Sequence, residues 1–264
     1  MIFVARWTAA IIFLQIAMSV AVCSPASDGD PENFRIELLG AAWLVNPSGT
    51  IQSSGTLIDL VSDLGAEQRQ PTFFGRLVAK PGRKHRIVIE GTPFRISGYN
   101  TIDRTIVYHG QTFNINETVR SSADLNYFFA GYQYDFLSGS MGHLGLSVGG
   151  AYLGATGRIS SVPVGTTATK TENIGLPLAG VEGRIFPLLG HKIITIEADI
   201  RGMDVGAYGH YLETSGSGGI SAGPFTILAG YRMVRADIHT SSSSNPQGVD
   251  AHLKGPIFSL EWRW

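Results

Sequence analysis

The sequence lacks most of the features that point to a soluble enzyme or to a nucleic-acid-binding protein. It contains one cysteine, Cys23, so we expect no disulfide bridge and no thiol chemistry in the exported chain. Charged residues make up only 16% of it, against roughly 25% in soluble domains, and a net charge of −1 provides no basic face for nucleic acid. The histidines show no metal-binding spacing, and the glycine-rich run at Ser215–Gly219 is not followed by the Lys-Ser/Thr pair of a phosphate loop. No metal or other cofactor is therefore expected.

The start of the chain has the pattern of an export signal. A positively charged stretch precedes an almost unbroken apolar run at Thr8–Val22, and small residues follow in VCSPAS. The run is shorter than the ~20 residues of a spanning helix, so a membrane anchor is less favoured. Acylation of Cys23 is also less favoured, because the bulky Val22 precedes the cysteine where a small residue is expected. Cleavage after Cys23 or Ala26 would leave a signal peptide at residues 1–26 and one domain at residues 27–264. Beyond the signal, no run of about 18 apolar residues offers a transmembrane helix.

The rest of the chain consists of segments in which apolar and polar residues alternate. In KIITIEADIRG, for example, Ile194, Ile196 and Ile200 fall on one side, whereas Glu197 and Asp199 fall on the other. A period of two predicts half-buried strands and not helices. Two architectures alternate in this way: a soluble sandwich with its apolar face in a core, and a membrane barrel with its apolar face in lipid.

The lengths of the connections distinguish these two architectures. Short connections lie at Pro81–Lys84, Ser138–Gly142, Leu188–His191 and Ser221–Pro224, and long polar ones at Asn46–Gln70, Gly98–Ser121, Gly157–Asn173, Gly202–His210 and His239–Asp250. Short and long connections alternate strictly, as do the tight periplasmic turns and longer extracellular loops of outer-membrane barrels. The sequence therefore predicts an all-β, up-and-down antiparallel transmembrane β-barrel with both termini in the periplasm.

The connections imply about ten strands. The segment at 211–220 is rich in glycine and serine and has no convincing lipid-facing side, so eight strands is the alternative. In the fourth strand the apolar residues change face, which predicts a β-bulge near Tyr127. A hairpin around His109–Gly110 is predicted within the second long loop. The predicted strands cover residues 33–45, 71–80, 85–97, 122–137, 143–156, 174–187, 192–202, 211–220, 225–238 and 251–264.

The last ten residues, GPIFSLEWRW, place large apolar side chains on one face of a strand that runs to the final residue. The closing strand of a barrel stays ordered to its end, and indole rings favour the headgroup level. The ending resembles the C-terminal insertion signal of bacterial outer-membrane proteins, with tryptophan where phenylalanine is usual. The residues of this signal are Phe258, Leu260, Trp262 and Trp264.

The domain as a whole resembles the small outer-membrane β-barrel proteins, a broad group with OmpA- and OmpW-like members. The segments DLVSDLG (Asp59–Gly65) and GRKHRIVIEGTPFRISG (Gly82–Gly98) are similar to segments of uncharacterised barrels of this kind. The resemblance implies an outer-membrane location and carries no catalytic residue. It implies two partners, the lipids of the outer membrane and the barrel-assembly machinery, and it leaves the oligomeric state open.

The polar faces of the predicted strands carry charges of both signs, which would face the barrel lumen. They are interpreted either as an ion-pair network that fills the lumen or as the lining of a pore. We favour the network, because a selective pore would show one dominant sign. The predicted lumen-facing residues are Arg35, Glu37, Arg76, Arg86, Glu90, Glu182, Arg184, Glu197, Asp199, Arg201, Arg232, Glu261 and Arg263.

A structural or interaction role, with loops that face the outside, is the function that the sequence favours. A narrow, porin-like channel for a small solute is the alternative. A membrane-embedded lipid hydrolase comes third: His239 and Ser241 resemble the H-x-S pair of lipid A deacylases, but they open a serine-rich loop. Asp59, Asp63 and Glu67 would bind calcium only if a loop helix placed them on one face, and a solvated acidic loop is the simpler interpretation.

Overall fold

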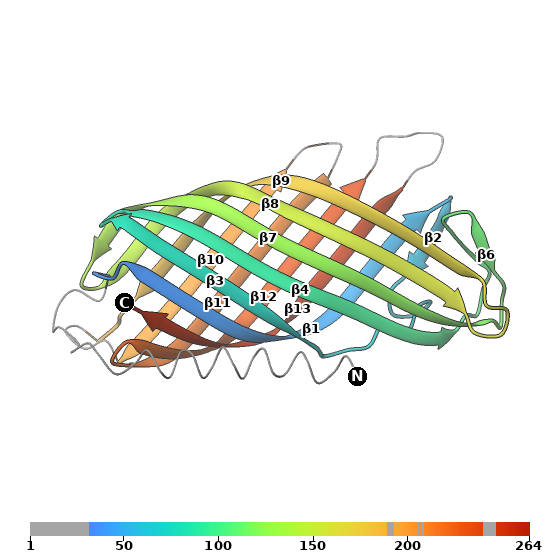
Figure 1. Cartoon of the computed structure of the whole chain (residues 1–264), viewed down its shortest axis with the longest axis horizontal. Helices are drawn as coiled ribbons and strands as arrows, with labels where there is room; N and C mark the ends of the chain where they lie inside the picture. Colours follow the sequence, from blue (N-terminus) through green and yellow to red (C-terminus); the bar gives the residue numbers. More distant parts are fainter. Residues whose placement is uncertain (1–31, 189–192, 205, 207–208, 240–246) are drawn as a thin grey trace.

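Long strands joined by tight turns form one wall that closes on itself (Figure 1). The computed structural model describes residues 32–188, 193–204, 206, 209–239 and 247–264. Within these residues no helix is long and apolar enough to cross a membrane. The strands are β1 (Ile36–Ser53), β2 (Thr56–Asp59), β3 (Gln70–Gly82), β4 (His85–Thr101), β5 (Ile106–Tyr108), β6 (Gln111–Phe113), β7 (Thr118–Gly139), β8 (Gly142–Ser161), β9 (Thr167–Ile185), β10 (Ile194–Asp204), β11 (Gly209–Ala222), β12 (Phe225–His239) and β13 (Gly248–Arg263).

Ten of these strands form the closed antiparallel barrel, namely β1, β3, β4 and β7 to β13 in chain order. The barrel closes where β13 pairs with β1, and Trp262 lies opposite Leu38 there. Trp264 continues this ladder, because its amide donates to the carbonyl of Ile36 at 2.9 Å and its carbonyl accepts from the amide of Ile36 at 2.9 Å. Every barrel strand is thus paired on both sides.

The two ends of the barrel differ. What we call the turn end carries the tight β3–β4, β7–β8 and β11–β12 connections and Trp264. What we call the cap end carries β2 and the β5–β6 hairpin (Figure 1). The hairpin turns at His109 and Gly110, whose φ angles are 48° and 79°, which confirms the hairpin predicted there.

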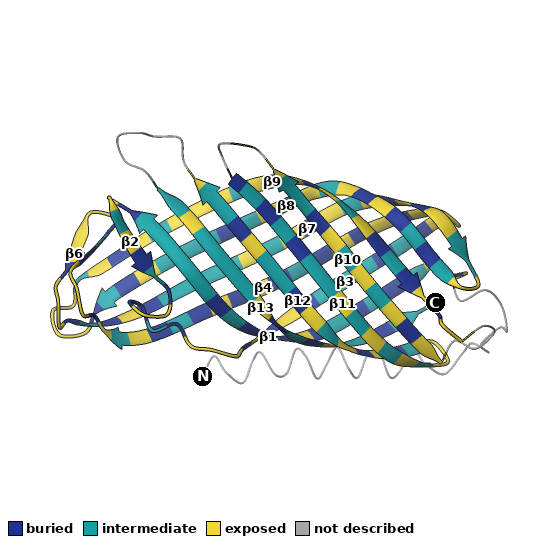
Figure 2. Ribbon diagram, turned by 180° about the vertical axis from the view of Figure 1, so that it is seen from behind, coloured by how far each residue is buried: buried dark blue, intermediate teal, exposed yellow. Residues whose placement is uncertain are grey.

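Side chains alternate between the lumen and the exterior along each barrel strand, which produces the banded burial of Figure 2. On β8, Leu146 and Val148 are 56% and 58% exposed, whereas Ser147 between them is buried. Large apolar side chains cover the exterior in the same way on neighbouring strands, as expected of a lipid-facing band. Exterior residues of this kind include Ile87, Ile89, Val181, Ile194, Ile196, Ile200, Ile220 and Ile227.

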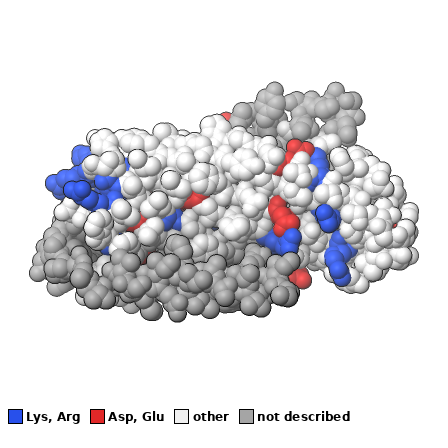
Figure 3. Space-filling model, in the orientation of Figure 1, with Lys and Arg blue, Asp and Glu red and all other residues white. Residues whose placement is uncertain are grey.

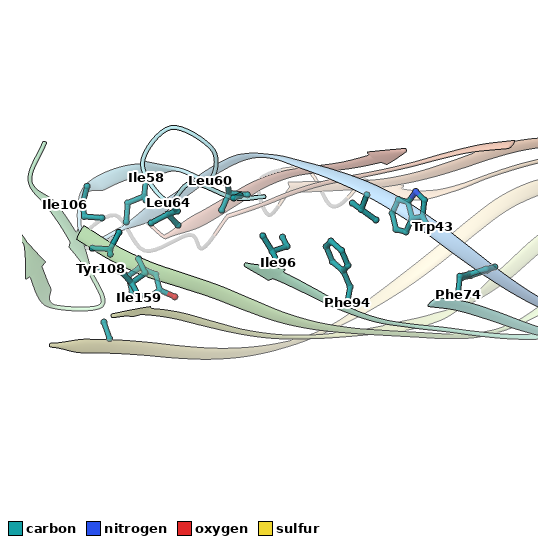
Figure 4. Close-up of a cluster of buried hydrophobic side chains, with 14 of the residues drawn as sticks. Trp43, Ile58, Leu60, Leu64, Phe74, Phe94, Ile96, Ile106, Tyr108 and Ile159 are labelled. Atoms are coloured by element: carbon teal, nitrogen blue, oxygen red, sulfur yellow. The ribbon is translucent and has the colours of Figure 1, made fainter. Parts of the chain in front are cut away.

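Apolar side chains close the cap end. Ile58 of β2, Ile106 of β5 and Phe113 of β6 are fully buried. They belong to one cluster with Trp43 and Phe94 of the barrel wall (Figure 4). The loops at this end are therefore part of the packed interior.

All ten predicted strands are present, so the alternative of eight strands is excluded. The segment at 211–220 lies within β11, which pairs with both β10 and β12. The strands extend further toward the cap end than predicted: β1 runs to Ser53, and β7 begins at Thr118. The sequence analysis assigned these extensions to loops because they are rich in serine, threonine and glycine.

The β-bulge predicted near Tyr127 is wrong. The register of β7 shifts between Asp135 and Leu137, and the pairing is continuous around Tyr127. Leu125 and Tyr127 face the lumen and pack on its apolar clusters, whereas Phe128 faces the exterior. Both faces of β7 are apolar at this level, so no change of phase is needed. The prediction assumed that every apolar face points to lipid.

Replacing Ile200 by arginine should lower the yield of folded, membrane-inserted protein. Ile200 lies near the middle of β10 on the exterior and is 48% exposed. An arginine on the lipid face near the midplane costs about 2–4 kcal/mol. The measurement is the fraction of liposome-refolded protein that migrates as the folded band on an unboiled detergent gel. Val164→Arg, in the turn after β8 where Val164 is 71% exposed, is the control. Equal yields from the two variants would contradict the lipid-facing assignment.

Candidate functional site

The segment that precedes β1 closes the lumen at the turn end. Glu32 and Phe34 are 3% and 8% exposed. Lys80 Nζ donates to the main-chain oxygen of Glu32 at 2.7 Å, and Arg86 Nη2 donates to its carboxylate at 2.6 Å. Arg184 Nη1 lies 3.4 Å from the same carboxylate. A carboxylate of the chain itself thus occupies a cationic site inside the barrel.

The ring of Phe34 lies among the same cations. Its centroid is 4.6 Å from Lys80 Nζ and 5.5 Å from Arg86 Cζ. The corresponding distances to Arg184 Cζ and Arg263 Cζ are 6.0 Å and 5.8 Å. Each such cation–π contact contributes about 0.5–2 kcal/mol, toward the upper value when water is excluded. Carboxylate and ring together hold the segment in place.

Arg184 is the centre of the first charge layer, which surrounds this segment. Its side chain is 1% exposed, so its guanidinium has lost its water and requires several carboxylates in exchange. Arg184 Nε lies 2.5 Å from Glu197, and Nη2 lies 2.8 Å from Glu37 and 3.0 Å from Glu261. The layer is completed by Arg86 with Asp135 at 2.7 Å, by Arg263 with Glu37 at 3.2 Å, and by His143, whose Nε2 lies 3.6 Å from Glu182.

A second charge layer lies further along the strands toward the cap end. Arg201 Nη2 donates to the two carboxylate oxygens of Glu90 at 2.8 Å and 2.7 Å and lies 3.3 Å from Glu213. Arg232 Nη2 donates to the same oxygen of Glu213 at 2.6 Å. The hydroxyl of Tyr211 donates to Glu213 at 3.0 Å. Glu213 is therefore shared by two arginines and a tyrosine.

Arg76 links the two layers. Its Nη2 contacts Glu182 of the first layer, and its Nε lies 3.4 Å from Glu90 of the second. A cavity of about 40 Å³ lies beside it, bordered by Asp199 and Ser259 among others. A space of this size holds no more than a few waters, since one water occupies at least ~10–15 Å³ on the same measure. The contacts between the layers are therefore nearly dry.

Aromatic rings separate the second charge layer from the apolar cap. Arg201 Cζ lies 4.6 Å from the centroid of Phe129. Arg232 Cζ lies 4.1 Å from the centroid of Phe74 and 5.5 Å from that of Trp43. Trp43 and Phe74 also belong to the apolar cluster of the cap end. The lumen is thus charged toward the turn end, apolar toward the cap end, and filled in both halves.

Arg35 lies outside the lumen network in which it was predicted. It precedes β1, its side chain is exposed, and its amide donates to the carbonyl of Trp264 at 2.8 Å. The predicted strand began at residue 33, three residues before β1 begins at Ile36. The other predicted residues are members of the network: Glu37, Arg76, Arg86, Glu90, Glu182, Arg184, Glu197, Asp199, Arg201, Arg232, Glu261 and Arg263.

The sequence analysis omitted several residues that the network contains. Glu32 precedes the first strand, and Asp135 lies near the end of β7, next to the β7–β8 turn. Glu213 lies in the glycine-rich β11, where it is directly opposite Arg201. That cross-strand pair of opposite charges is the signal that could have identified Glu213. Lys80 and His143 also belong to the network.

The pair suggested for lipid hydrolysis is only partly described. His239 ends β12, and its Nε2 lies 2.6 Å from Asp237 Oδ1. Ser241 lies outside the described residues, as do Cys23 and the predicted signal peptide at 1–26.

The acidic residues of the first long connection form a turn and not a helix. Asp59 Oδ1 accepts hydrogen bonds from the amides of Val61 and Ser62 at 2.8 Å and 2.7 Å, and Asp63 pairs with Arg104. Burial raises the pKa of Asp63, but hydrogen bonds from Arg104 and from the Asp59 amide outweigh burial and lower this pKa below its ordinary value. In the described part of the chain, no three His, Cys, Asp or Glu side chains are grouped to hold a metal ion.

Acid should loosen the cap around Asp63. Because its pKa is lowered in the folded protein, the stabilisation by Asp63 is fully present above the ordinary aspartate pKa of about 3.9. It is lost as the pH falls through the lower, folded-state pKa. As the pH falls from about 4.5 to about 2, pepsin cleavage of the native protein between Leu57 and Ala66 should therefore increase more than the same cleavage of the Asp63→Asn variant. The variant lacks the charge at both pH values and corrects for the pH dependence of pepsin. A constant ratio would contradict this role of Asp63.

Replacing Arg184 by methionine should destabilise the barrel by about 3–5 kcal/mol, because four carboxylates would lose a buried partner. The free energy of unfolding in denaturant, measured in detergent micelles, tests this. Arg35→Met removes an exposed arginine at the same end and should change stability by no more than about 0.5 kcal/mol. Equal effects of the two substitutions would show that the first charge layer does not hold the barrel.

Comparison with known proteins agrees with this architecture. No protein-family model matches the chain. No curated protein matches it in sequence. Among solved structures, the outer membrane protease OmpT of Escherichia coli is similar with a TM-score of 0.59 at 9% identity, over 87% of this chain and 97% of that one. Ail of Yersinia pestis, in complex with a heparin analogue, has a TM-score of 0.40 at 8% identity, over 86% and 99%. The likeness to OmpT shows the fold alone, and the chain has the transmembrane β-barrel fold of outer-membrane proteins.

Proposed function

We propose that this protein is a barrel of the bacterial outer membrane with a structural or interaction role and without an open channel. The filled lumen is the observation that carries this proposal. Arg86, Arg184 and Glu261 are at most 1% exposed in the charged half, and Ile58 and Phe113 are fully buried in the apolar half. A permeating ion would have to break ion pairs and then cross an apolar plug. Both steps cost free energy. Breaking a buried ion pair leaves charges without a partner, and an ion in the apolar plug loses its hydration.

The outer-membrane location is supported by the exterior apolar band and by the barrel fold. We place the turn end in the periplasm and the cap end outside the cell, since tight turns and both termini lie on the periplasmic side of such barrels. A signal peptide at residues 1–26 would direct export, and residues 27–264 would form the inserted domain. A place among the OmpA- and OmpW-like small barrels is part of the same proposal.

The last strand would serve as the signal for the barrel-assembly machinery. Phe258 and Trp264 are 53% and 59% exposed, and Leu260 and Trp262 share their exterior face of β13. Before β13 pairs with β1, this strand has one free edge and one apolar face. A free edge is a template for pairing with another chain, which is what an assembly partner requires.

An interaction role is supported by the ordered cap. Arg104, in the next long connection, donates hydrogen bonds to the carbonyl of Leu57 in β2 and to Asp63 in the turn after β2, and so ties these segments together. Leu57 and Ile115 stand out from this surface, at 54% and 55% exposure. A fixed surface with protruding apolar side chains is suited to binding other molecules, because little conformational entropy is lost on contact. The proposal assigns no enzymatic activity and no cofactor.

Planar-bilayer recording tests the closed lumen. The native protein should give no discrete conductance steps, while a porin in the same bilayer gives them. Insertion is established beforehand by a shifted unboiled gel band and by flotation with liposomes. Discrete steps from the native protein would replace this proposal by the narrow channel. A protein that neither shifts nor floats would contradict the membrane location itself.

A further inference from the structure

The exterior wall near the cap end carries an arginine cluster that the lumen does not use. Arg95 of β4, Arg120 of β7 and Arg158 of β8 face outward from adjacent strands. Figure 3 shows charged side chains gathered on this face close to the end that carries β6, beyond a largely uncharged surface. On the exterior of β7 and β8, Phe128 and Tyr152 lie opposite one another and are both 49% exposed.

The cluster begins where the apolar wall ends. Gly91 of β4 lies opposite Phe128, and Arg95 follows four residues further toward the cap. At about 3.3 Å per residue, this places Arg95 roughly 13 Å along the strand beyond the aromatic row. Arg158 and Arg120 lie further in the same direction. Aromatic rows of this kind mark the edge of the hydrocarbon layer, so the arginines stand at the level of the headgroups and above.

Two of the three arginines have an unbalanced charge. Arg95 donates from Nε and Nη2 to Asp124 at 2.6 Å and 2.8 Å. Arg120 and Arg158 are exposed, and no described carboxylate lies within ion-pair distance of either. Arg120 is opposite Ser160, so Arg158 is its diagonal neighbour, roughly 7–8 Å away at the backbone. Like charges this close repel each other, and an anion between them would be stabilised by both.

The cluster borders a hollow with the dimensions of a small-ligand site. Its volume is about 700 Å³, within the range of about 300–1,000 Å³ that such sites occupy. Hydroxyl groups supply hydrogen-bond donors and acceptors beside the arginines. One carboxylate, Glu67, also borders the hollow. The remaining polar side chains of the lining are those of Ser97, Tyr99, Ser121, Ser122, Ser160 and Ser161.

We propose that this hollow binds the phosphorylated sugar headgroup of an outer-leaflet glycolipid, with Arg120 and Arg158 sharing one phosphate. The proposal rests on the outer-membrane location proposed above. Guanidinium groups bind phosphate through paired hydrogen bonds, and serine hydroxyls suit the hydroxyls of a sugar. The acyl chains would lie on the apolar wall around Phe128 and Tyr152. Continuity with that wall favours a lipid over a soluble anion.

Binding of purified lipid A to the protein in nanodiscs of zwitterionic lipid tests the site. The native protein should bind bisphosphorylated lipid A, and the double variant Arg120→Gln/Arg158→Gln should bind it about tenfold or more weakly. The affinity of the native protein should fall as salt is added. Arg235→Gln is the matched control, because Arg235 is an exposed, outward arginine of β12 and lies outside the hollow. It should retain native affinity.

Three outcomes would overturn the proposal. The double variant would bind as tightly as the native protein, or dephosphorylated lipid A would bind as tightly as the phosphorylated form, or inorganic phosphate would displace lipid A at equal concentration. A gel shift shows that each variant is folded, and Arg120→Lys/Arg158→Lys should recover part of the affinity. Failure of the native protein to enter nanodiscs would instead contradict the proposed location, so the two failures are distinguishable.

Discussion

Backbone pairing is the constraint from which the rest of the structure follows. A strand in lipid has no water to bond its amides and carbonyls, so every barrel strand needs a partner on each side. The contact that satisfies this condition joins the two ends of the chain, where Trp264 exchanges hydrogen bonds with Ile36 and β13 lies along β1. Once the wall is closed, its interior is a narrow space that side chains must fill. The composition of the lumen is a consequence of that closure.

The interior is filled in two chemically different ways. In the charged half, each arginine has exchanged its hydration for several carboxylates, as Arg184 has with Glu37, Glu197 and Glu261. Such a network tolerates little change, because removal of one partner leaves the other charged groups buried without a counter-charge. The barrel strands alone do not complete it. Glu32, from outside the wall, is the carboxylate that Arg86 and Lys80 share.

Strand number, order and closure could be predicted because they depend on local signals, namely alternation and the lengths of connections. The lumen pairs that join strands far apart in the chain could not, whereas a pair on neighbouring strands such as Arg201 and Glu213 could have been. Arg201 and Glu90 are separated by 111 positions, and only closure brings them together. Glu32 had no strand pattern to mark it. Tyr127 was misassigned for a physical reason: the prediction allowed one apolar environment, the lipid, whereas the folded barrel has two.

The two apolar environments explain why the strands are longer than a bilayer requires. Near the turn end of β7, Tyr132 and Tyr134 are exposed outward while Gln133 and Asp135 are buried inward. Near its cap end the pattern is inverted, with Val119 buried inward and Arg120 exposed outward. A polar exterior over an apolar interior is the arrangement of a protein in water, and its inverse is that of a barrel in lipid. A spanning strand needs about 9–11 residues, and β7 has 22. The additional length is therefore an extension with a polar exterior and its own apolar core, and in the proposed membrane placement the arginines on its outer face lie directly above the lipid-facing band.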